Sequence, residues 1–143
     1  MIHRLFAEQF DIALRYEKRE VAPGTLAEAV VEYRRLGVRG INITVPLKEE
    51  ACRIATGHTS RARVAGAANV LTLDEPERLE ADNTDGVGLV RDLLNHAIDV
   101  KGLRVLLLGA GGAARGVLPA LLSAGTATVT VANRTASRAE ALV

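Results

Sequence analysis

Cysteine, tryptophan and long apolar runs are scarce or absent in this 143-residue sequence. Tryptophan is missing, and the single cysteine, Cys52, cannot form a disulfide within the chain. No run reaches the roughly 18 apolar residues that a membrane-spanning helix requires. Residues 1–10 carry charge on a helical pattern and lack the apolar centre of a secretion signal. We therefore expect a cytoplasmic protein with no membrane partner.

Aromatic residues make up only 3% of the sequence, so the core must be built mainly from Leu, Val, Ile and Ala. The hydrophobic share of 48% and the charged share of 24% are typical of a globular protein. These values exclude a disordered chain and a collagen-like chain.

Neither a nucleic-acid partner nor a metal is indicated. The net charge is +1, and no stretch concentrates Lys and Arg without nearby acidic residues. The three histidines, His3, His58 and His96, are scattered, and Cys52 stands apart from them, so zinc or iron ligand spacing is lacking. We assign no metal.

Helical and strand patterns alternate along the chain, which predicts an α/β fold with parallel sheet layers covered by helices. A change of composition at residues 98–102 suggests two domains, residues 1–98 and residues 99–143. The expected strands are 14–21, 40–45, 67–73, 78–83, 103–108 and 127–132. The expected helices are 2–10, 25–36, 48–55, 86–96 and 113–123, with another helix opening near the end.

Local signals support several of these boundaries. Thr25 and Glu28 form a capping-box sequence at a helix start, and Gly37 is placed to end that helix. Residues 74–77 are typical of a turn between two strands. Residues 103–108 are largely apolar, which is typical of a buried parallel strand.

A glycine-rich loop separates that apolar strand from the next helix, which is the setting of a dinucleotide-binding fingerprint. Gly109 would permit the tight turn, Gly111 would let a pyrophosphate approach the backbone, and Ala114 would let the helix pack closely on the strand. The helix start offers free N–H groups to phosphates. A turn that binds nothing is the alternative. The candidate loop residues are Gly109, Ala110, Gly111, Gly112 and Ala113.

The end of the second strand of this unit predicts NADP as the cofactor. An NAD site carries an acidic residue there, whereas this chain has Asn133, Arg134 and Thr135, with Arg138 close behind. A guanidinium can pair with a 2′-phosphate through two charge-assisted hydrogen bonds. The alternative is that Arg134 and Arg138 only decorate a solvated surface.

Polar clusters follow or flank strands in the first half of the chain. Lys48 lies just after one expected strand and Asp85 after another, and an ammonium and a carboxylate that converge could act as an acid–base pair. Thr44 and Asn69 could donate or accept hydrogen bonds with a polyhydroxylated substrate. Taken singly, Lys48 could be a surface residue and Asp85 a helix N-cap.

Five motifs, in order, resemble those of the shikimate dehydrogenase family. They are Asn-x-Thr-x-Pro-x-Lys at 42–48, Gly-Ala-x-Asn at 66–69, Asn-Thr-Asp-Gly at 83–86, Gly-Ala-Gly-Gly-Ala at 109–113 and Asn-Arg-Thr at 133–135. The resemblance implies an α/β substrate (catalytic) domain followed by the first part of a Rossmann-type dinucleotide-binding domain.

It further implies NADPH-dependent, reversible reduction of 3-dehydroshikimate to shikimate in aromatic amino acid biosynthesis. By this resemblance Lys48 and Asp85 are the catalytic pair and also bind substrate, and Thr44 and Asn69 are substrate ligands. The hydride would come from the nicotinamide, while the protein supplies positioning and charge stabilisation.

The sequence also departs from the family pattern. It begins after the family's N-terminal strand and its Ser-Lys-Ser-Pro-type loop, whose serines bind the substrate carboxylate, and it stops after the second strand of the nucleotide domain. We therefore expect an internal fragment with uncovered apolar strand faces and impaired activity alone. A quinate/shikimate dehydrogenase and a non-catalytic nucleotide-binding remnant are the alternatives, and the oligomeric state is left open.

Overall fold

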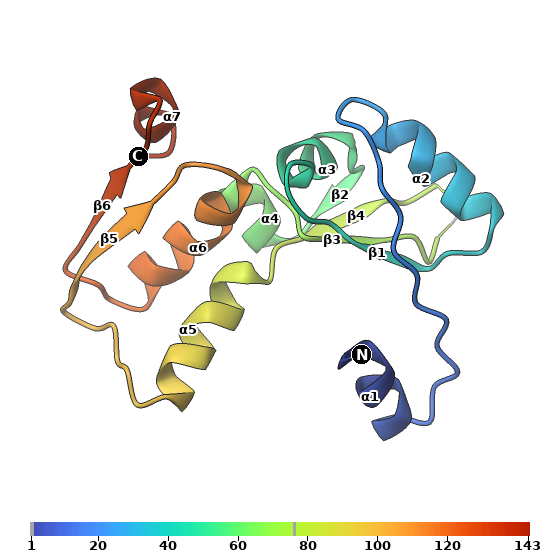
Figure 1. Cartoon of the computed structure of the whole chain (residues 1–143), viewed down its shortest axis with the longest axis horizontal. Helices are drawn as coiled ribbons and strands as arrows, with labels where there is room; N and C mark the ends of the chain where they lie inside the picture. The colour runs from blue at the N-terminus through green and yellow to red at the C-terminus, as the bar shows by residue number, and fades with distance from the viewer. Residues whose placement is uncertain (1, 76) are drawn as a thin grey trace.

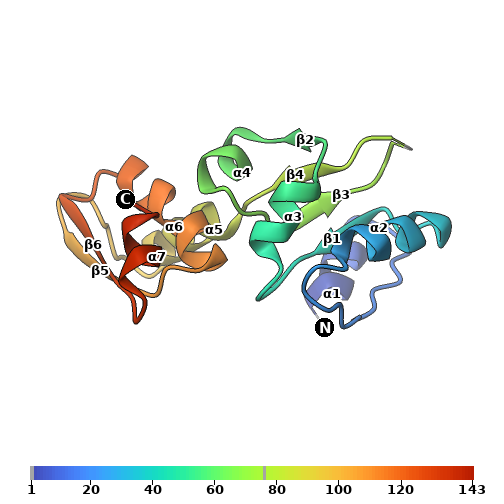
Figure 2. The ribbon, with the colours of Figure 1, turned by 90° about the horizontal axis from the view of Figure 1, so that it is seen from above.

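The computed structural model describes residues 2–75 and 77–143 and has an α/β fold whose two parts lie side by side (Figures 1 and 2). Among the helices of these residues, none is both long enough and apolar enough to cross a bilayer. The first part contains α1 (Ile2–Gln9), α2 (Leu26–Arg35), β1 (Gly40–Asn42), α3 (Lys48–Ile54), β2 (Gly57–His58), α4 (Ser60–Ala65), β3 (Val70–Thr72) and β4 (Glu80–Asp82). The second contains α5 (Asp85–Asn95), β5 (Arg104–Leu108), α6 (Gly112–Ser123), β6 (Thr128–Ala132) and α7 (Ala136–Glu140).

The first sheet is mixed, with the strand order β1-β3-β4-β2. The pairs β1–β3 and β3–β4 are antiparallel, and only β2–β4 is parallel, so the expected parallel layer is wrong for this sheet. The reason is local, because β3 and β4 form a hairpin, as the patterns at 67–73 and 78–83 predict. The predicted turn at 74–77 includes Pro76, which lies outside the described residues.

An aliphatic core packs against this sheet, as the low aromatic content predicts. Leu26 and Val30 of α2 lie against Leu71 of β3 and Ala81 of β4, and Leu26 and Leu71 are the largest fully buried side chains. Helices α2 and α3 cover one side of the sheet, while α1 lies on the other (Figure 1). The core therefore fixes α3, whose first residue is Lys48.

The expected strand at 14–21 is wrong, because this segment is extended without being part of a sheet. Alternating side chains favour a strand only when a neighbouring strand accepts its backbone hydrogen bonds. No such neighbour lies beside it within the described residues. Two of its residues contact the rest of the first part instead. The ring of Tyr16 stacks on His3 with centroids 4.0 Å apart and its hydroxyl accepts a hydrogen bond from Asn42, while Val21 packs against the core.

The helix α2 forms where expected, but its predicted capping box is wrong. The Thr25 hydroxyl donates to Ala22 O and does not cap the helix. Glu50 of α3 takes this role, since its carboxylate accepts from the N–H groups of Gly24 at 2.9 Å and Leu26 at 3.0 Å. These bonds, the one from Gly24 foremost, hold the pKa of Glu50 below its ordinary value.

The second part is a β–α–β unit in which β5 and β6 are parallel and pair along their whole length, from Arg104 opposite Thr128 to Leu108 opposite Ala132. Its strands and helices fall where the sequence predicts. The expected burial of β5 is wrong, because Leu106 and Leu108 are 61% and 76% exposed. Alternate residues are half-buried, so the described helices cover only one face of this sheet. The uncovered apolar face expected from the sequence is thus confirmed.

Helices α5 and α6 lie side by side and cross closely (Figure 1). A Cβ atom at Gly86 would overlap the carbonyl oxygen of Gly116 and would lie 2.6 Å from the Cβ of Ala120. Only glycine fits at such a crossing, so the last residue of the Asn-Thr-Asp-Gly motif has a packing role. The contact brings α6 next to the end of β4.

Replacing Glu50 with Gln should lower the free energy of unfolding by about 1 kcal/mol at neutral pH, because both N–H groups lose a charged acceptor and one of them then faces an amide NH2 group instead of an oxygen. The folded-state pKa of Glu50 is depressed, so its contribution is fully present above the ordinary value of 4.5 and is lost as pH falls through the folded pKa. Urea unfolding of the full-length protein at neutral and acidic pH should therefore show the difference shrinking in acid.

Glu28→Gln is the matched control, because Glu28 occupies the capping-box position but is exposed on α2. It should change stability less than Glu50→Gln does. A larger loss of stability in Glu28→Gln than in Glu50→Gln would mean that the local capping box, and not the carboxylate from α3, caps the start of the helix.

Candidate functional site

Lys48 and Asp85 form an ion pair between two elements that are distant in sequence. Lys48 Nζ lies 2.6 Å from Asp85 Oδ2, and the two side chains are 12% and 21% exposed. Lys48 is the first residue of α3 and Asp85 the first residue of α5. Lys48 is therefore no ordinary surface residue. Asp85 is not an N-cap either, because its carboxylate turns to Lys48.

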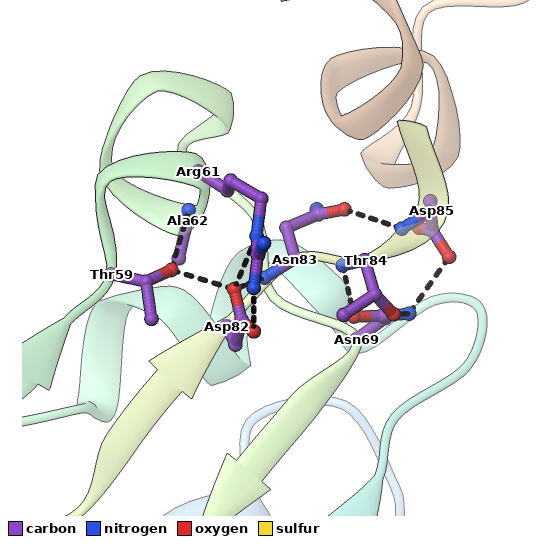
Figure 3. A network of polar contacts seen from close by, with 8 residues as sticks. All are labelled: Thr59, Arg61, Ala62, Asn69, Asp82, Asn83, Thr84 and Asp85. Carbon is purple, nitrogen blue, oxygen red and sulfur yellow. Dashed lines mark hydrogen bonds and ion pairs between the residues drawn. The ribbon is translucent and has the colours of Figure 1, made fainter. Parts of the chain in front are cut away.

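Asn69 fixes the second oxygen of the Asp85 carboxylate (Figure 3). The Asn69 amide donates to Asp85 Oδ1 and to Thr84 Oγ, each at 2.9 Å. Its oxygen accepts from the Thr84 N–H at 2.9 Å. Both N–H bonds of the Asn69 amide are thus engaged, and one lone pair of its oxygen is left. The structure therefore brings together three of the four predicted substrate-site residues.

Asn83 lies between Asp82 and Asp85 and is almost fully buried, at 2% exposed (Figure 3). Its amide donates to Ala67 O at 2.9 Å. Its oxygen accepts from the Asp85 N–H at 3.1 Å, a bond that Figure 3 shows. Burying an amide is unfavourable unless its hydrogen bonds are made inside the protein. Asn83 therefore connects the backbone of Asp85 to the backbone of Ala67, which lies between α4 and β3.

A second polar group holds the end of β4 in place (Figure 3). The Asp82 carboxylate is paired with the Arg61 guanidinium through two bonds, of 3.1 Å and 2.5 Å, and accepts from the Thr59 hydroxyl at 2.7 Å. Arg61 is the main cause that keeps the pKa of Asp82 below its ordinary value, with help from Thr59 and the Asn83 N–H. Residues at the start of α4 therefore hold the end of β4, which leads into Asp85, in place.

Thr44 is not part of the cluster. Its side chain is exposed, and its backbone oxygen accepts from Leu47 N at 2.9 Å in the turn between β1 and α3. Its hydroxyl makes no hydrogen bond to any residue that the structure describes, so it remains available to a ligand.

The glycine-rich loop lies between β5 and α6, as the sequence predicts. Gly109 has φ +105°, a conformation that favours glycine, and its N–H extends the ladder by bonding Ala132 O at 2.8 Å. Ala110 and Ala114 are buried. Gly111 precedes the helix, and no side chain caps α6 there. The first N–H groups of α6 are consequently free for an anionic group.

Arg134 and Arg138 lie beyond β6, the first in the loop and the second on α7. Both are exposed, and neither forms a salt bridge with residues 2–75 or 77–143. Asn133 donates to Thr135 O at 2.8 Å and so shapes the loop that carries Arg134. Two cations are thus presented at the end of the second strand.

The start of α6 touches Lys48. A Cβ atom at Gly112 would lie 2.7 Å from Lys48 Cβ and 3.5 Å from both Cγ and Cδ. The helix that begins at the glycine-rich loop therefore packs directly on the side chain that carries the ammonium group. The Lys48–Asp85 pair and the glycine-rich loop therefore lie next to each other.

Models of two family domains match the sequence. The shikimate dehydrogenase substrate binding domain matches residues 1–71, and shikimate / quinate 5-dehydrogenase matches residues 90–143. The shikimate dehydrogenase (NADP(+)) of Marinobacter nauticus is 54% identical over 142 residues, which cover 99% of this chain and 52% of that relative. The chain belongs to the shikimate dehydrogenase family.

Further members of the shikimate dehydrogenase family agree. The enzyme of the same name from Alkalilimnicola ehrlichii is 52% identical over 143 residues, covering 99% of this chain and 53% of its own. The crystal structure of shikimate 5-dehydrogenase from Thermus thermophilus in complex with NADP(H) and shikimate matches with a TM-score of 0.86 and 37% identity, covering 99% of this chain and 52% of that one. The chain thus spans about half the length of these relatives.

Sequence reasoning missed several residues that shape this shikimate dehydrogenase family site. Asn83 stands in a recognised motif, yet its burial could not be read from the motif. No sequence pattern indicated a role for Gly116 or Arg115, because their contacts with Asn83 and Glu49 form only when α6 packs against the first part of the chain. Two shallow hollows lie elsewhere, one lined by Thr56 and Arg78 among others, and neither includes the pair.

Asn83→Ala should lower the free energy of unfolding by about 1–3 kcal/mol, because it leaves the carbonyl of Ala67 and the N–H of Asp85 without partners inside the protein. Urea unfolding of the full-length protein measures this loss. Asn95→Ala, at the exposed end of α5, is the control and should have little effect. Equal stability of the two variants would show that the buried amide contributes nothing net.

Proposed function

We propose that the full-length protein carrying this chain is an NADP-dependent shikimate dehydrogenase, which reduces 3-dehydroshikimate reversibly to shikimate. The observation that carries this proposal is the 2.6 Å ion pair of Lys48 and Asp85, which lies directly beside the start of α6. The curated relatives that bear this name support it, since their similarity extends over 99% of the chain.

In this proposal the chain contains two domains, one for the substrate and one for the cofactor. Residues 1–98 supply the substrate-binding and catalytic groups, and residues 99–143 supply the start of a Rossmann-type NADP-binding domain. Helix α5 ends the first domain in sequence but packs on α6 of the second. This packing gives the two domains a shared support next to the reacting groups.

Lys48 is the proposed proton donor and Asp85 its partner. When bound, NADPH supplies the hydride that reduces the carbonyl carbon. The Lys48 ammonium donates a hydrogen bond to the carbonyl oxygen and passes its proton there as negative charge develops. Asp85 keeps that ammonium oriented through Oδ2, while Asn69 holds the carboxylate through Oδ1. In the reverse direction Lys48 removes the same proton.

Thr44 and Asn69 are the proposed ligands of substrate hydroxyl groups. The Thr44 hydroxyl is exposed and can donate or accept. Asn69 offers only the remaining lone pair of its amide oxygen, because both of its N–H bonds are already used. Its share in binding would therefore be to accept a hydrogen bond from a substrate hydroxyl, besides orienting Asp85.

We assign residues to the cofactor because their chemistry suits the phosphate groups of NADP. Residues 109–113 form a small-residue loop at an uncapped helix start, which suits a pyrophosphate. Asn133 and Thr135 shape the next loop, and Arg134 and Arg138 offer two cations to the 2′-phosphate. An NAD-type acidic residue is absent at this strand end.

An assay of shikimate oxidation with NADP⁺, followed by NADPH absorbance, tests the proposal on the full-length protein beside this chain alone. We expect turnover by the full-length protein and weaker or no turnover by the chain. A folded full-length protein without turnover would instead favour a non-catalytic nucleotide-binding protein. Faster turnover of quinate with NAD⁺ would favour a quinate/shikimate dehydrogenase.

Lys48→Ala should reduce the turnover number at least about 100-fold, because it removes the group that exchanges a proton with the reacting oxygen. Steady-state kinetics in the full-length protein, with circular dichroism to check the fold, measure this effect. Lys101→Ala alters an exposed lysine in the turn before β5 and should stay near wild-type. Near-normal activity of folded Lys48→Ala would remove Lys48 from the chemistry.

Arg134→Ala should raise the dissociation constant of NADPH about tenfold or more, since a charge-assisted bond to the 2′-phosphate is lost. The dissociation constant of NADH, which lacks that phosphate, should change little. Fluorescence titration with each nucleotide gives both values. Arg91→Ala, at an exposed arginine of α5, is the control. Equal weakening of both nucleotides by Arg134→Ala would contradict the 2′-phosphate role.

A further inference from the structure

Two glycines one turn apart on α6 lie against the supports of the Lys48–Asp85 pair. Gly112 faces the Lys48 side chain, where an added Cβ would lie 2.7 Å from Lys48 Cβ. Gly116 faces the Asn83 amide, where an added Cβ would lie 2.5 Å from Oδ1 and 2.7 Å from Nδ2. Residues four apart share one helix face, so a single face of α6 makes both contacts.

These contacts reach both members of the ion pair by different routes. Lys48 is touched directly, along the carbon stem that carries its ammonium group. Asp85 is reached through Asn83, whose oxygen accepts the Asp85 N–H at 3.1 Å. Because Asn83 is 2% exposed and its amide also bonds Ala67 O, it has little room to move aside. Any shift of α6 toward these residues would displace the pair.

Arg115 adds a charged contact between the same two elements. Its Nε lies 3.5 Å from Glu49 Oε2 on α3, the residue next to Lys48, and the Nε atom is shielded from solvent. Its Nη1 lies beside Gly66, 3.9 Å from where a Cβ would be. The guanidinium thus sits between α6, α3 and the loop before Asn69. Its charge attraction to Glu49, which is an ion pair without a hydrogen bond, links the start of α6 to the start of α3.

We propose that α6 positions the Lys48–Asp85 pair, with Gly116 and Arg115 as the positioning residues. This inference rests on the proposed function. Under it, the helix whose first turn holds the cofactor phosphates also sets the spacing of the acid–base pair. Cofactor placement and proton transfer therefore share one rigid element, and misplacing α6 lowers the rate of the chemical step.

Gly116→Ala in the full-length protein is the direct test, and Gly88→Ala is its matched control. Both are helical glycines, but a Cβ at Gly88 meets no atom within 4 Å. Gly116→Ala should lower the turnover number about tenfold or more, since misplacing reacting groups by about 1 Å can cost up to a hundredfold. The KM for shikimate should change less than about threefold, and Gly88→Ala should keep wild-type kinetics.

A kinetic isotope effect separates mispositioning from a smaller folded fraction. In the reduction of 3-dehydroshikimate by NADPH deuterated at the transferred hydrogen, slower chemistry in Gly116→Ala should raise the isotope effect on the turnover number of that direction. Loss of folded protein alone would lower the rate and leave the isotope effect unchanged. An unchanged isotope effect, or kinetics equal to those of Gly88→Ala, would overturn the proposal.

Arg115→Gln and Glu49→Gln provide a second route that puts no atom into the packed helix crossing. Each should lower the turnover number and raise the isotope effect, and the double variant should be no worse than either alone, because both remove one contact. Arg115→Lys should recover part of the rate. If Gly116→Ala does not fold, wild-type kinetics in both charge variants overturn the proposal, and lowered turnover with a raised isotope effect supports it.

The failure of this inference is distinguishable from the failure of the proposed function. A wild-type protein without shikimate turnover would remove the proposed function and the inference together. An active wild-type protein whose Gly116 and Arg115 variants behave normally would remove the positioning role alone.

Discussion

The ion pair of Lys48 and Asp85 organises the centre of this structure. Its partners are 37 positions apart, and each begins a helix. Half-buried charges cost desolvation free energy, which is offset only when the geometry is good and the remaining lone pairs are used. Asn69 uses one of these lone pairs, because its amide donates a hydrogen bond to the second Asp85 oxygen. The starts of α3, β3 and α5 are thereby held around one point.

Helix α6 packs against the residues that form and support this ion pair. Its glycines allow it to approach Lys48 and Asn83 more closely than any other residue would permit. This arrangement explains why small residues continue past the glycine-rich loop. Those in the loop suit a phosphate, whereas Gly116 lies further along the helix and suits a neighbouring side chain. One run of small residues therefore serves two purposes, which a motif alone cannot separate.

Much of this arrangement could be predicted from sequence where the cause is local. The alternation of strand and helix patterns, the loop at 109–113 and the helix after it follow from periodicity and glycine content, and the structure has them. Family membership followed from five ordered motifs. The proximity of Lys48, Asn69 and Asp85 could be expected because polar residues at strand ends collect at one edge of a sheet.

Apart from the antiparallel hairpin of the first sheet, whose cause is local, the errors depend on residues distant in sequence. The segment 14–21 alternates like a strand but has no neighbour to accept its hydrogen bonds among the residues that the structure describes. Leu106 and Leu108 are apolar like buried residues but face solvent, because the described helices cover only one side of their sheet. The burial of Asn83 likewise arises from α6, whose Gly116 lies 33 positions further along the chain.

The carboxylate of Glu50 has a wider consequence for α2. A helix of ten residues is marginal by itself, since the first turn fixes several backbone angles before hydrogen bonds accumulate. Here the N–H groups at its beginning are satisfied from α3, 24 and 26 positions away. Helix α2 therefore depends on α3 for the hydrogen bonds at its start, and an opening of α3 would leave those N–H groups without their acceptor.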